Sequence, residues 1–302
     1  MKKIICLLSV FLTFFALASD PIIAKDSPMR IVVPVPVGGS FDRVARALQQ
    51  SLQAELGRSF YVDNKPGGNA VVGTRELINH QGKDPVLMVS GIGVFINYVL
   101  IDGVSDVTPI FYLGYVPEVF VSKPTFRYDT LSDLVKNSQE RITLATINQG
   151  GDTSSILVSS TRKTNIDLIY YKGGQQAMVD LMAGVLDLAP ANISTAKPLI
   201  ESGKIKALGV TGARRHKDFP NLPTYSEQGI NIPSSLQFYV WVNKGATPAQ
   251  IERIVTALDA VMQRDDYKKD AEFIGLIRPT IRGSASAHFA ESKQRIYSII
   301  NK

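Results

Sequence analysis

The stretch from Met29 to Asp42 reads MRIVVPVPVGGSFD, and it predicts an α/β fold. Its first half, Met29 to Val35, is a short apolar and β-branched run that is typical of a buried strand. A turn with two glycines follows, with Ser40 as the expected N-cap of a helix. Apolar residues then recur at three- and four-residue spacing as far as Leu56, and Gly57 is the expected stop.

The same alternation of strand and helix continues along the chain. Because strands that alternate with helices form mainly parallel sheets covered on both faces, the pattern predicts two α/β lobes. The further strands are expected at Phe60–Val62, Pro85–Ser90, Ile142–Thr146, Leu168–Tyr171, Asp187–Pro190, Lys206–Thr211 and Leu236–Val242. The further helices are expected at Ala70–Asn79, from a capping box at Thr130–Asp133, at Gln175–Met182, from a Ser194 cap to Gly203, at Pro248–Met262 and at Ser286–Ile300.

The composition excludes several classes of protein. The 302 residues are 45% hydrophobic and 20% charged, which is ordinary for a globular chain. The net charge of +6 is spread along the chain, so no nucleic-acid partner is predicted. The single cysteine argues against a disulfide framework, a cysteine-based zinc site and a thiol redox pair. The three histidines are isolated from one another, which argues against a histidine-rich metal site. No cofactor is predicted.

Residues Met1 to Ala18 have the pattern of a secretory signal peptide. Lys2 and Lys3 precede an apolar run of the right length for a signal core, and Ala16 and Ala18 suit cleavage after Ala18. A weaker cleavage site follows Ala24, and an uncleaved membrane anchor is the alternative. Cleavage removes Cys6, the only cysteine, which fits export to the oxidising periplasm.

The familiar local motifs of enzymes are missing from the sequence. It contains no GxSxG elbow, GxxxxGK[ST] phosphate loop, GxGxxG fingerprint or HExxH pair. This favours a binding protein over an enzyme. A periplasmic hydrolase or isomerase remains an alternative, for which Asp42 and Asp152 are the acidic residues in the relevant loops.

Small polar residues follow several predicted strands and are the candidate ligand site. A helix N-terminus leaves backbone N–H groups unpaired and carries partial positive charge, which suits a carboxylate. In open α/β sheets, ligands bind beyond the carboxyl ends of the strands. Asp42 is expected to hold its loop through backbone N–H bonds or to orient a water. The candidate residues are Gly38, Gly39, Ser40 and Asp42, then Ser90 and Gly91, then Thr146, Asn148, Gln149, Gly150, Thr153 and Ser154.

A series of short motifs in one order carries a resemblance to a known family. They include Arg30–Pro34 with Gly38, Gly39 and Asp42, then Asn64–Gly67, Asp106–Ile110, Tyr171–Gly174, Gly184–Leu188, Ser202–Leu208, Leu222–Thr224 and Gly245–Pro248. Through these motifs the chain resembles the periplasmic solute-binding proteins of tripartite tricarboxylate transporters, the Bug-type receptors.

The resemblance implies a bilobal, type II-like binding protein with two crossover strands and a ligand cleft between the lobes. One lobe is expected at 28–119 plus 244–302 and the other at 120–243. The resemblance also adds Gly173 and Asn192 to the candidate ligand-binding residues, and it implies that the ligand is a small organic carboxylate. Two membrane transporter subunits are the implied partners of a monomeric receptor. A receptor that signals to a membrane sensor kinase is the alternative.

The chain departs from the family pattern at several positions near the expected site. Val37 and Phe41 stand where the family commonly has Pro and Thr, and Tyr170 stands where it has Pro. Ala191 replaces an acidic residue beside Asn192. Phe41 is expected to narrow the pocket or to add an aromatic wall. These departures leave the class of carboxylate open.

Overall fold

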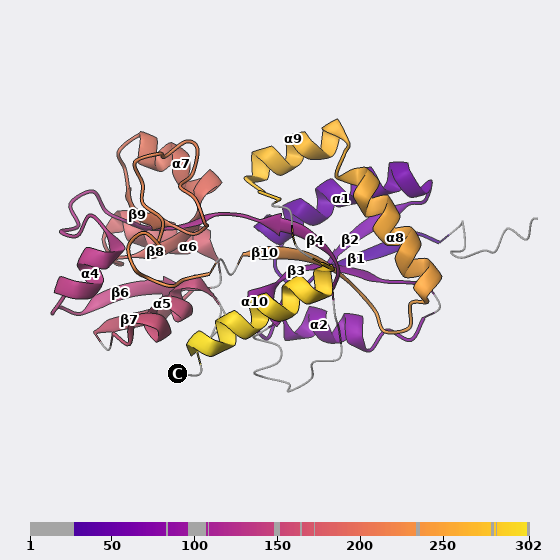
Figure 1. Cartoon of the computed structure of the whole chain (residues 1–302), viewed down its shortest axis with the longest axis horizontal. Helices are drawn as coiled ribbons and strands as arrows, with labels where there is room; N and C mark the ends of the chain where they lie inside the picture. The colour runs from indigo at the N-terminus through magenta and orange to yellow at the C-terminus, as the bar shows by residue number, and fades with distance from the viewer. Residues whose placement is uncertain are drawn as a thin grey trace, which may run out of the picture.

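A computed structural model of the chain describes residues 27–82, 84–95, 107, 109–147, 152–163, 165–171, 173–233, 236–278, 281 and 283–300. The described elements form two α/β parts that lie side by side along the longest axis of the molecule (Figure 1). This is the predicted bilobal architecture. The predicted signal peptide lies outside the described residues, and no described helix has the length and apolar character needed to cross a membrane.

The first lobe is built on a five-stranded sheet with the order β2-β1-β3-β10-β4. Strands β1, β2 and β3 are parallel, whereas β10 runs antiparallel to both β3 and β4. The strands are β1 (Met29–Val33), β2 (Phe60–Asn64), β3 (Leu87–Gly91), β4 (Pro109–Tyr115) and β10 (Gln237–Val242). The helices of this part are α1 (Ser40–Leu56), α2 (Val71–Ile78), α8 (Pro248–Val261), α9 (Asp265–Ile274) and α10 (Ala285–Ile300).

Alternating side chains of the central strands supply two separate cores. Ile31 and Val33 of β1 belong to the core under α1, α8 and α9, whereas Val32 belongs to the core on the opposite face. A period of two along a strand sends successive side chains to opposite faces. Both faces of the sheet are therefore covered, as the apolar run at Met29–Val33 predicts, and β10 is buried along its whole length.

The second lobe contains a three-stranded antiparallel sheet, β8-β5-β9, beside the parallel pair β6-β7. A bridge between Leu144 and Leu188 connects the two. The strands are β5 (Glu118–Ser122), β6 (Ile142–Thr146), β7 (Ile166–Tyr170), β8 (Ala189–Asn192) and β9 (Lys206–Val210). The helices are α4 (Leu131–Asn137), α5 (Thr153–Thr161), α6 (Gly174–Ala183) and α7 (Ile193–Glu201).

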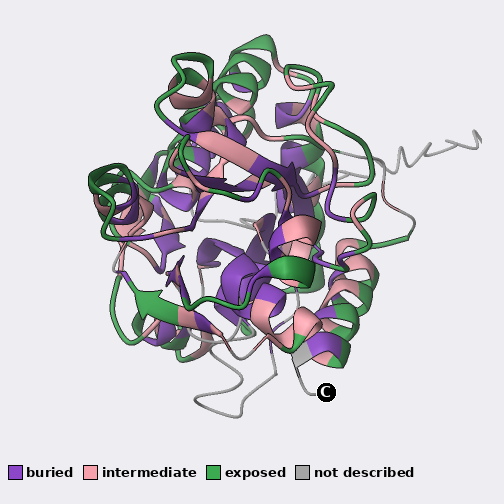
Figure 2. Cartoon of the chain, turned by 90° about the vertical axis from the view of Figure 1, so that its left-hand side faces the viewer, coloured by how far each residue is buried: buried purple, intermediate pink, exposed green. Residues whose placement is uncertain are grey.

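The chain crosses between the lobes twice, from β4 to β5 and back from β9 to β10. Strand β10 therefore lies in the sheet of the first lobe, although its residues fall inside the range 120–243 that the sequence analysis assigned to the second. Helix α10 packs against both β4 and α5. One buried core joins the two lobes along this side, since it includes Trp241 and Phe289 as well as Ile156. Buried segments run through the middle of the molecule in Figure 2.

The helix ends agree with the sequence in several places and differ in two. Thr130 caps α4 by accepting from Asp133 N at 3.0 Å, as predicted. Two other predicted caps are wrong. Gly39 is the N-cap of α1, and Ser40 is its first residue. Asn192 is the N-cap of α7, and Ser194 lies inside the helix, where its hydroxyl donates to Ile274 O at 2.9 Å.

Candidate functional site

The loop between β1 and α1 is held in shape by Asp42. This carboxylate is buried and accepts from the Gly38 amide at 2.9 Å, from Arg46 Nε at 3.0 Å and from Asn64 Nδ2 at 3.0 Å. Burial opposes ionisation, but the bonds from Arg46, Gly38 and Asn64 outweigh it and lower the pKa of Asp42 below its ordinary value. Asp42 therefore holds the loop by accepting a backbone N–H, the first of its two predicted roles.

The glycines of this loop leave its backbone open. A Cβ on Gly38 would meet nothing within 4 Å, and a Cβ on Gly39 would meet only Pro36 O at 3.7 Å. Gly38 has a φ of +88°, which a side chain would strain, whereas Gly39 has an ordinary φ of −72°. The first amides of α1 have no intrahelical acceptors and point out of the helix end. A ligand group can therefore approach these amides closely.

Ser40 and Asn192 meet at this helix end from opposite lobes. Asn192 Nδ2 donates to Ser40 Oγ at 2.6 Å, across 152 residues of sequence. Asn192 is the last residue of β8 and precedes α7, so a second helix N-terminus begins here. The structure thus brings together two residues that the sequence placed in one site but could not place in contact.

Ser90 lies in the interior with its hydroxyl unpaired. The residue is fully buried near the carboxyl end of β3, and its Oγ has no hydrogen-bond partner among the described residues. An unpaired buried hydroxyl costs free energy, so such a group at a strand end marks a position that a ligand can satisfy. Ser90 is opposite Tyr239 in the β3–β10 ladder.

The ring of Phe41 lies against the backbone of Gly91 and fills the space next to its Cα. A Cβ on Gly91 would lie 2.6 Å from Phe41 Cζ and 3.0 Å from Gln237 O. The Phe41 ring is buried and packs on Phe238 with a centroid separation of 4.7 Å. The Phe41 ring therefore belongs to the core beneath the loop and covers Gly91, one of the predicted site residues. That Phe41 narrows the pocket or adds an aromatic wall to it stays a prediction.

We expect Gly91→Ala to destabilise the protein by about 1–3 kcal/mol, because the added methyl group overpacks the contact with Phe41. Replacing Phe41 by Leu removes the Cζ atom and is expected to reduce this cost in the double variant. Thermal unfolding of the wild type, both single variants and the double variant measures the coupling. Strictly additive effects would show that the ring does not press on Gly91.

The second lobe contributes a loop organised by Asp152. This residue caps α5 by accepting from Ser155 N at 2.9 Å, and it also accepts from Ile147 N and Thr146 Oγ1. Ser154 is fully buried and donates to Ala145 O at 2.7 Å. The hydroxyl groups of Thr146 and Ser154 therefore donate their hydrogen bonds to acceptors within the second lobe. Asn148, Gln149 and Gly150 lie outside the described residues.

Three further residues of the second lobe belong to this region: Thr153, Glu118 and Gly173. Thr153 donates its hydroxyl to Glu118 Oε2 at 2.7 Å, and Glu118 pairs with Asn192 in the β5–β8 ladder. Glu118 was not among the predicted site residues, because nothing in its sequence neighbourhood links it to a loop after a strand. Gly173 is the N-cap of α6 and has open space at its Cβ position, as at Gly38.

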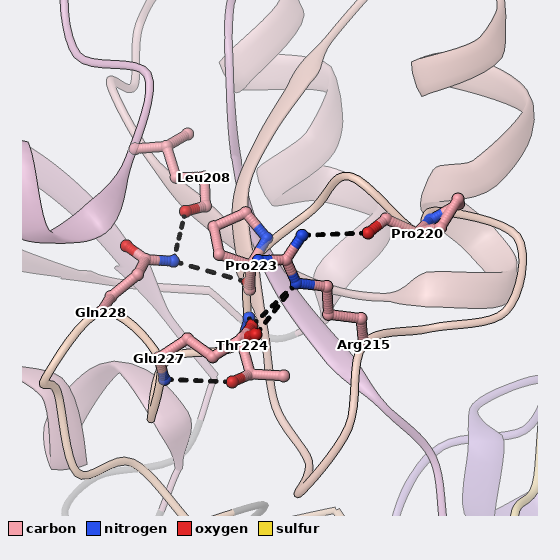
Figure 3. A network of polar contacts seen from close by, with 7 residues as sticks. All are labelled: Leu208, Arg215, Pro220, Pro223, Thr224, Glu227 and Gln228. Atoms are coloured by element: carbon pink, nitrogen blue, oxygen red, sulfur yellow. Dashed lines mark hydrogen bonds and ion pairs between the residues drawn. The ribbon is translucent and has the colours of Figure 1, made fainter.

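The basic cluster Arg214–Lys217 serves the structure of the second lobe. Arg215 Nε donates to both carboxylate oxygens of Glu227 at 3.0 Å, and its Nη1 donates to Pro220 O (Figure 3). Glu227 accepts in turn from Thr224 N at 2.7 Å, and the Arg215 bond lowers the pKa of Glu227. Gln228 ties the same segment to β9 through Leu208 O. This network therefore fixes the loop between Arg215 and Gln228 within the second lobe.

The part of the chain that the structure describes contains no group of three or more His, Cys, Asp or Glu side chains placed to hold a metal ion. The groups that converge between the lobes are backbone amides, hydroxyls and one amide side chain. Such groups suit a small anion with hydrogen-bonding capacity. Asp42 and Asp152 are both engaged by backbone and side-chain donors, and neither is placed as a free base.

Comparison with known proteins agrees with this geometry. The profile of the tripartite tricarboxylate transporter family receptor matches residues 44–281. The chain belongs to this receptor family. BugT of Bordetella pertussis is 28% identical over 283 residues, which cover 87% of this chain and 85% of BugT. The receptor is therefore of the Bug type, as its sequence motifs predict, and its relatives are described as solute-binding and periplasmic binding proteins.

Solved structures share the fold. The periplasmic binding protein BugD superposes with a TM-score of 0.73 at 24% identity and covers 91% of this receptor and 95% of its own chain. MatC from Rhodopseudomonas palustris, solved with bound malate, gives a TM-score of 0.75 at 19% identity, covering 91% and 98%. An R. palustris protein solved with adipate gives 0.70 at 22% identity, covering 91% and 94%.

Proposed function

We propose that this receptor binds a small organic carboxylate between its lobes in the periplasm and delivers it to the two membrane subunits of a tripartite tricarboxylate-type transporter. The observation that carries the proposal is the hydrogen bond between Ser40 and Asn192. It joins the two lobes at the N-terminus of α1. The open Cβ positions of Gly38 and Gly39 and the unpaired amides of this helix end support an anion site here.

In this proposal each group has a distinct role. The amides of Gly39 and Ser40 donate to one carboxylate oxygen, and the buried Ser90 hydroxyl donates to the carboxylate from the end of β3. Asp42 fixes the loop and does not react. Asn192, together with Gly173 and the Thr146–Ser154 loop, completes the site from the second lobe. No residue is assigned a catalytic role. The protein acts as a monomer, and its signal peptide is removed after Ala18 during export.

The relatives support the class of ligand. MatC was solved with malate and the second R. palustris protein with adipate, and both ligands are small carboxylates. The family description supports the transporter partnership. In this proposal the two lobes lie on either side of the site, and β10 belongs to the sheet of the first lobe.

Thermal unfolding with a panel of mono-, di- and tricarboxylates and amino acids tests the proposal. A ligand at about 100 times its Kd stabilises the folded state by about 2.7 kcal/mol, which raises Tm by several degrees in a protein of this size. We expect a shift with one chemical class of carboxylate. A panel without any shift, for a folded sample shown to be free of co-purified ligand by mass spectrometry, would contradict the proposal.

A further inference from the structure

The first turn of α7 contacts the first lobe at two places. Asn192, the N-cap of α7, donates to Ser40 Oγ at the N-terminus of α1. Two residues further on, Ser194 Oγ donates to Ile274 O at 2.9 Å, across 80 residues of sequence. Ile274 is the last residue of α9 in the first lobe. One helical turn of the second lobe therefore connects the ends of two helices of the first lobe.

The bond from Ser194 satisfies a group that α9 itself leaves unpaired. The last carbonyls of a helix have no donor within the helix, and Ile274 O is one of them. The C-terminus of α9 also carries partial negative charge, and it meets the N-terminus of α7, which carries partial positive charge. In the view of Figure 1, α7 and α9 lie on the upper side of the molecule and α10 lies on the lower side. The contact is therefore favourable for both helix ends.

The two helix ends also fit closely. Gly275 follows Ile274 with a φ of +81°, and a Cβ on Gly275 would lie 3.1 Å from Ser194 Cβ. This is tighter than an ordinary contact, so the absence of a side chain lets Ser194 reach the carbonyl. Lys217 of the second lobe and Glu272 of α9 form an ion pair at 3.5 Å, but both side chains are exposed and such pairs contribute little. The Ser194 bond is therefore the stronger candidate for fixing the position of α7 against α9.

We propose that Ser194 is a positioning residue for the ligand site and that it acts through Asn192. The inference rests on the proposed function, in which Asn192 completes the site from the second lobe. Because both residues lie in one helical turn, the bond of Ser194 to α9 fixes that turn and, with it, the Asn192 amide at Ser40. The Ser194 hydroxyl donates to α9, so it influences ligand affinity through the position of the helix and not by donating to the ligand.

Calorimetric titration with the acid that gives the largest thermal shift tests this role. We expect Ser194→Ala to raise Kd about fivefold, within the range that one neutral hydrogen bond contributes. Ser40→Ala removes the acceptor of the Asn192 bond but keeps the α1 amides. In that background, we expect the change at Ser194 to raise Kd by less than about twofold. The control is Ser202→Ala at the other end of α7, where the hydroxyl donates to Leu199 O of the same helix, and it should leave Kd unchanged.

The dependence on Ser40 separates positioning of Asn192 from general support of the second lobe. Loss of general support would raise Kd by the same factor in both backgrounds, and that result would overturn the inference. An unchanged Kd in Ser194→Ala would also overturn it, while leaving the proposed function intact. Absence of binding of every tested acid by the wild type would count against the proposed function and the inference together.

Discussion

Replacement of Gly39 by Leu is expected to abolish carboxylate binding, with affinity lowered by at least about a hundredfold, while the protein remains folded. A Cβ on Gly39 would make only an ordinary contact with Pro36 O at 3.7 Å, and the φ of −72° suits any L-residue, so the folded backbone tolerates the side chain. The leucine then fills the space next to the amides that the carboxylate must reach, and two or more charge-assisted hydrogen bonds are lost.

Titration of the wild type, Gly39→Ala and Gly39→Leu with the acid that gives the largest thermal shift measures this effect. The alanine variant serves as the matched control for loss of the glycine and is expected to give an intermediate affinity. Tm of each variant without ligand is expected to stay within about 1 °C of the wild type, because a surface change of this kind costs little. Undiminished affinity in Gly39→Leu would remove this loop from the site.

The second large effect is expected from Asp42→Asn, which should lower the free energy of unfolding by about 2 kcal/mol at neutral pH. The asparagine amide places a donor where the carboxylate accepts from Gly38 N, Arg46 Nε and Asn64 Nδ2, and it removes a charge-assisted bond. Ligand affinity is expected to fall as well, because the loop that presents the amides loses its internal support.

The pH dependence of this difference follows from the lowered pKa of Asp42. A carboxyl group with a lower pKa in the folded than in the unfolded state contributes stability above its ordinary value of 3.8, and this is lost as pH falls through the folded pKa. The gap between the wild type and Asp42→Asn is therefore expected to be constant near neutrality and to narrow below pH 3.8. Asp129→Asn, at an exposed carboxylate, is the control and should change stability by less than about 0.5 kcal/mol.

Asp42→Asn also separates the receptor from the hydrolase or isomerase alternative. If Asp42 were a catalytic base, the variant would lose turnover and keep its affinity for the carboxylate. The side-chain carboxylate of Asp42 accepts from three donors, so it is not free to act as a base. We therefore expect the reverse: Asp42→Asn binds the ligand more weakly, and neither the wild type nor the variant turns it over. Turnover of a carboxylate by the wild type that disappears in Asp42→Asn with unchanged binding would contradict the account.

Local pattern predicts much of the fold because strands and helices are encoded by nearby residues. The apolar run at Met29–Val33, the spacing along α1 and the cap at Thr130 were all legible in the sequence. The position of β10 in the sheet could not be predicted. Its aromatic sequence indicates that the strand is buried, but it does not indicate that the strand lies between β3 and β4. Helix α9 was missed because just Tyr267 and Ile274 are buried along its charged sequence, which weakens the apolar period.

The site shows the same division between local and long-range information. The role of Asp42 as a loop anchor follows from its position four residues after Gly38 and could be predicted. The contact of Ser40 with Asn192, the packing of Phe41 on Phe238 and the approach of Tyr170 to Asn69 depend on how distant segments meet. Glu118 enters the site region through strand pairing with Asn192, for which its own neighbours in sequence carry no signal.

A crystal structure of the protein grown with the acid that gives the largest thermal shift tests the central claim most directly. We predict a carboxylate between the lobes, with its oxygens within about 3 Å of the Gly39 or Ser40 amide and of Ser90 Oγ. The Asp42 bonds to Gly38 and Asn64 are expected to persist in that complex. A tightly bound acid located elsewhere on the protein, with the α1 amides and Ser90 Oγ untouched, would contradict the account.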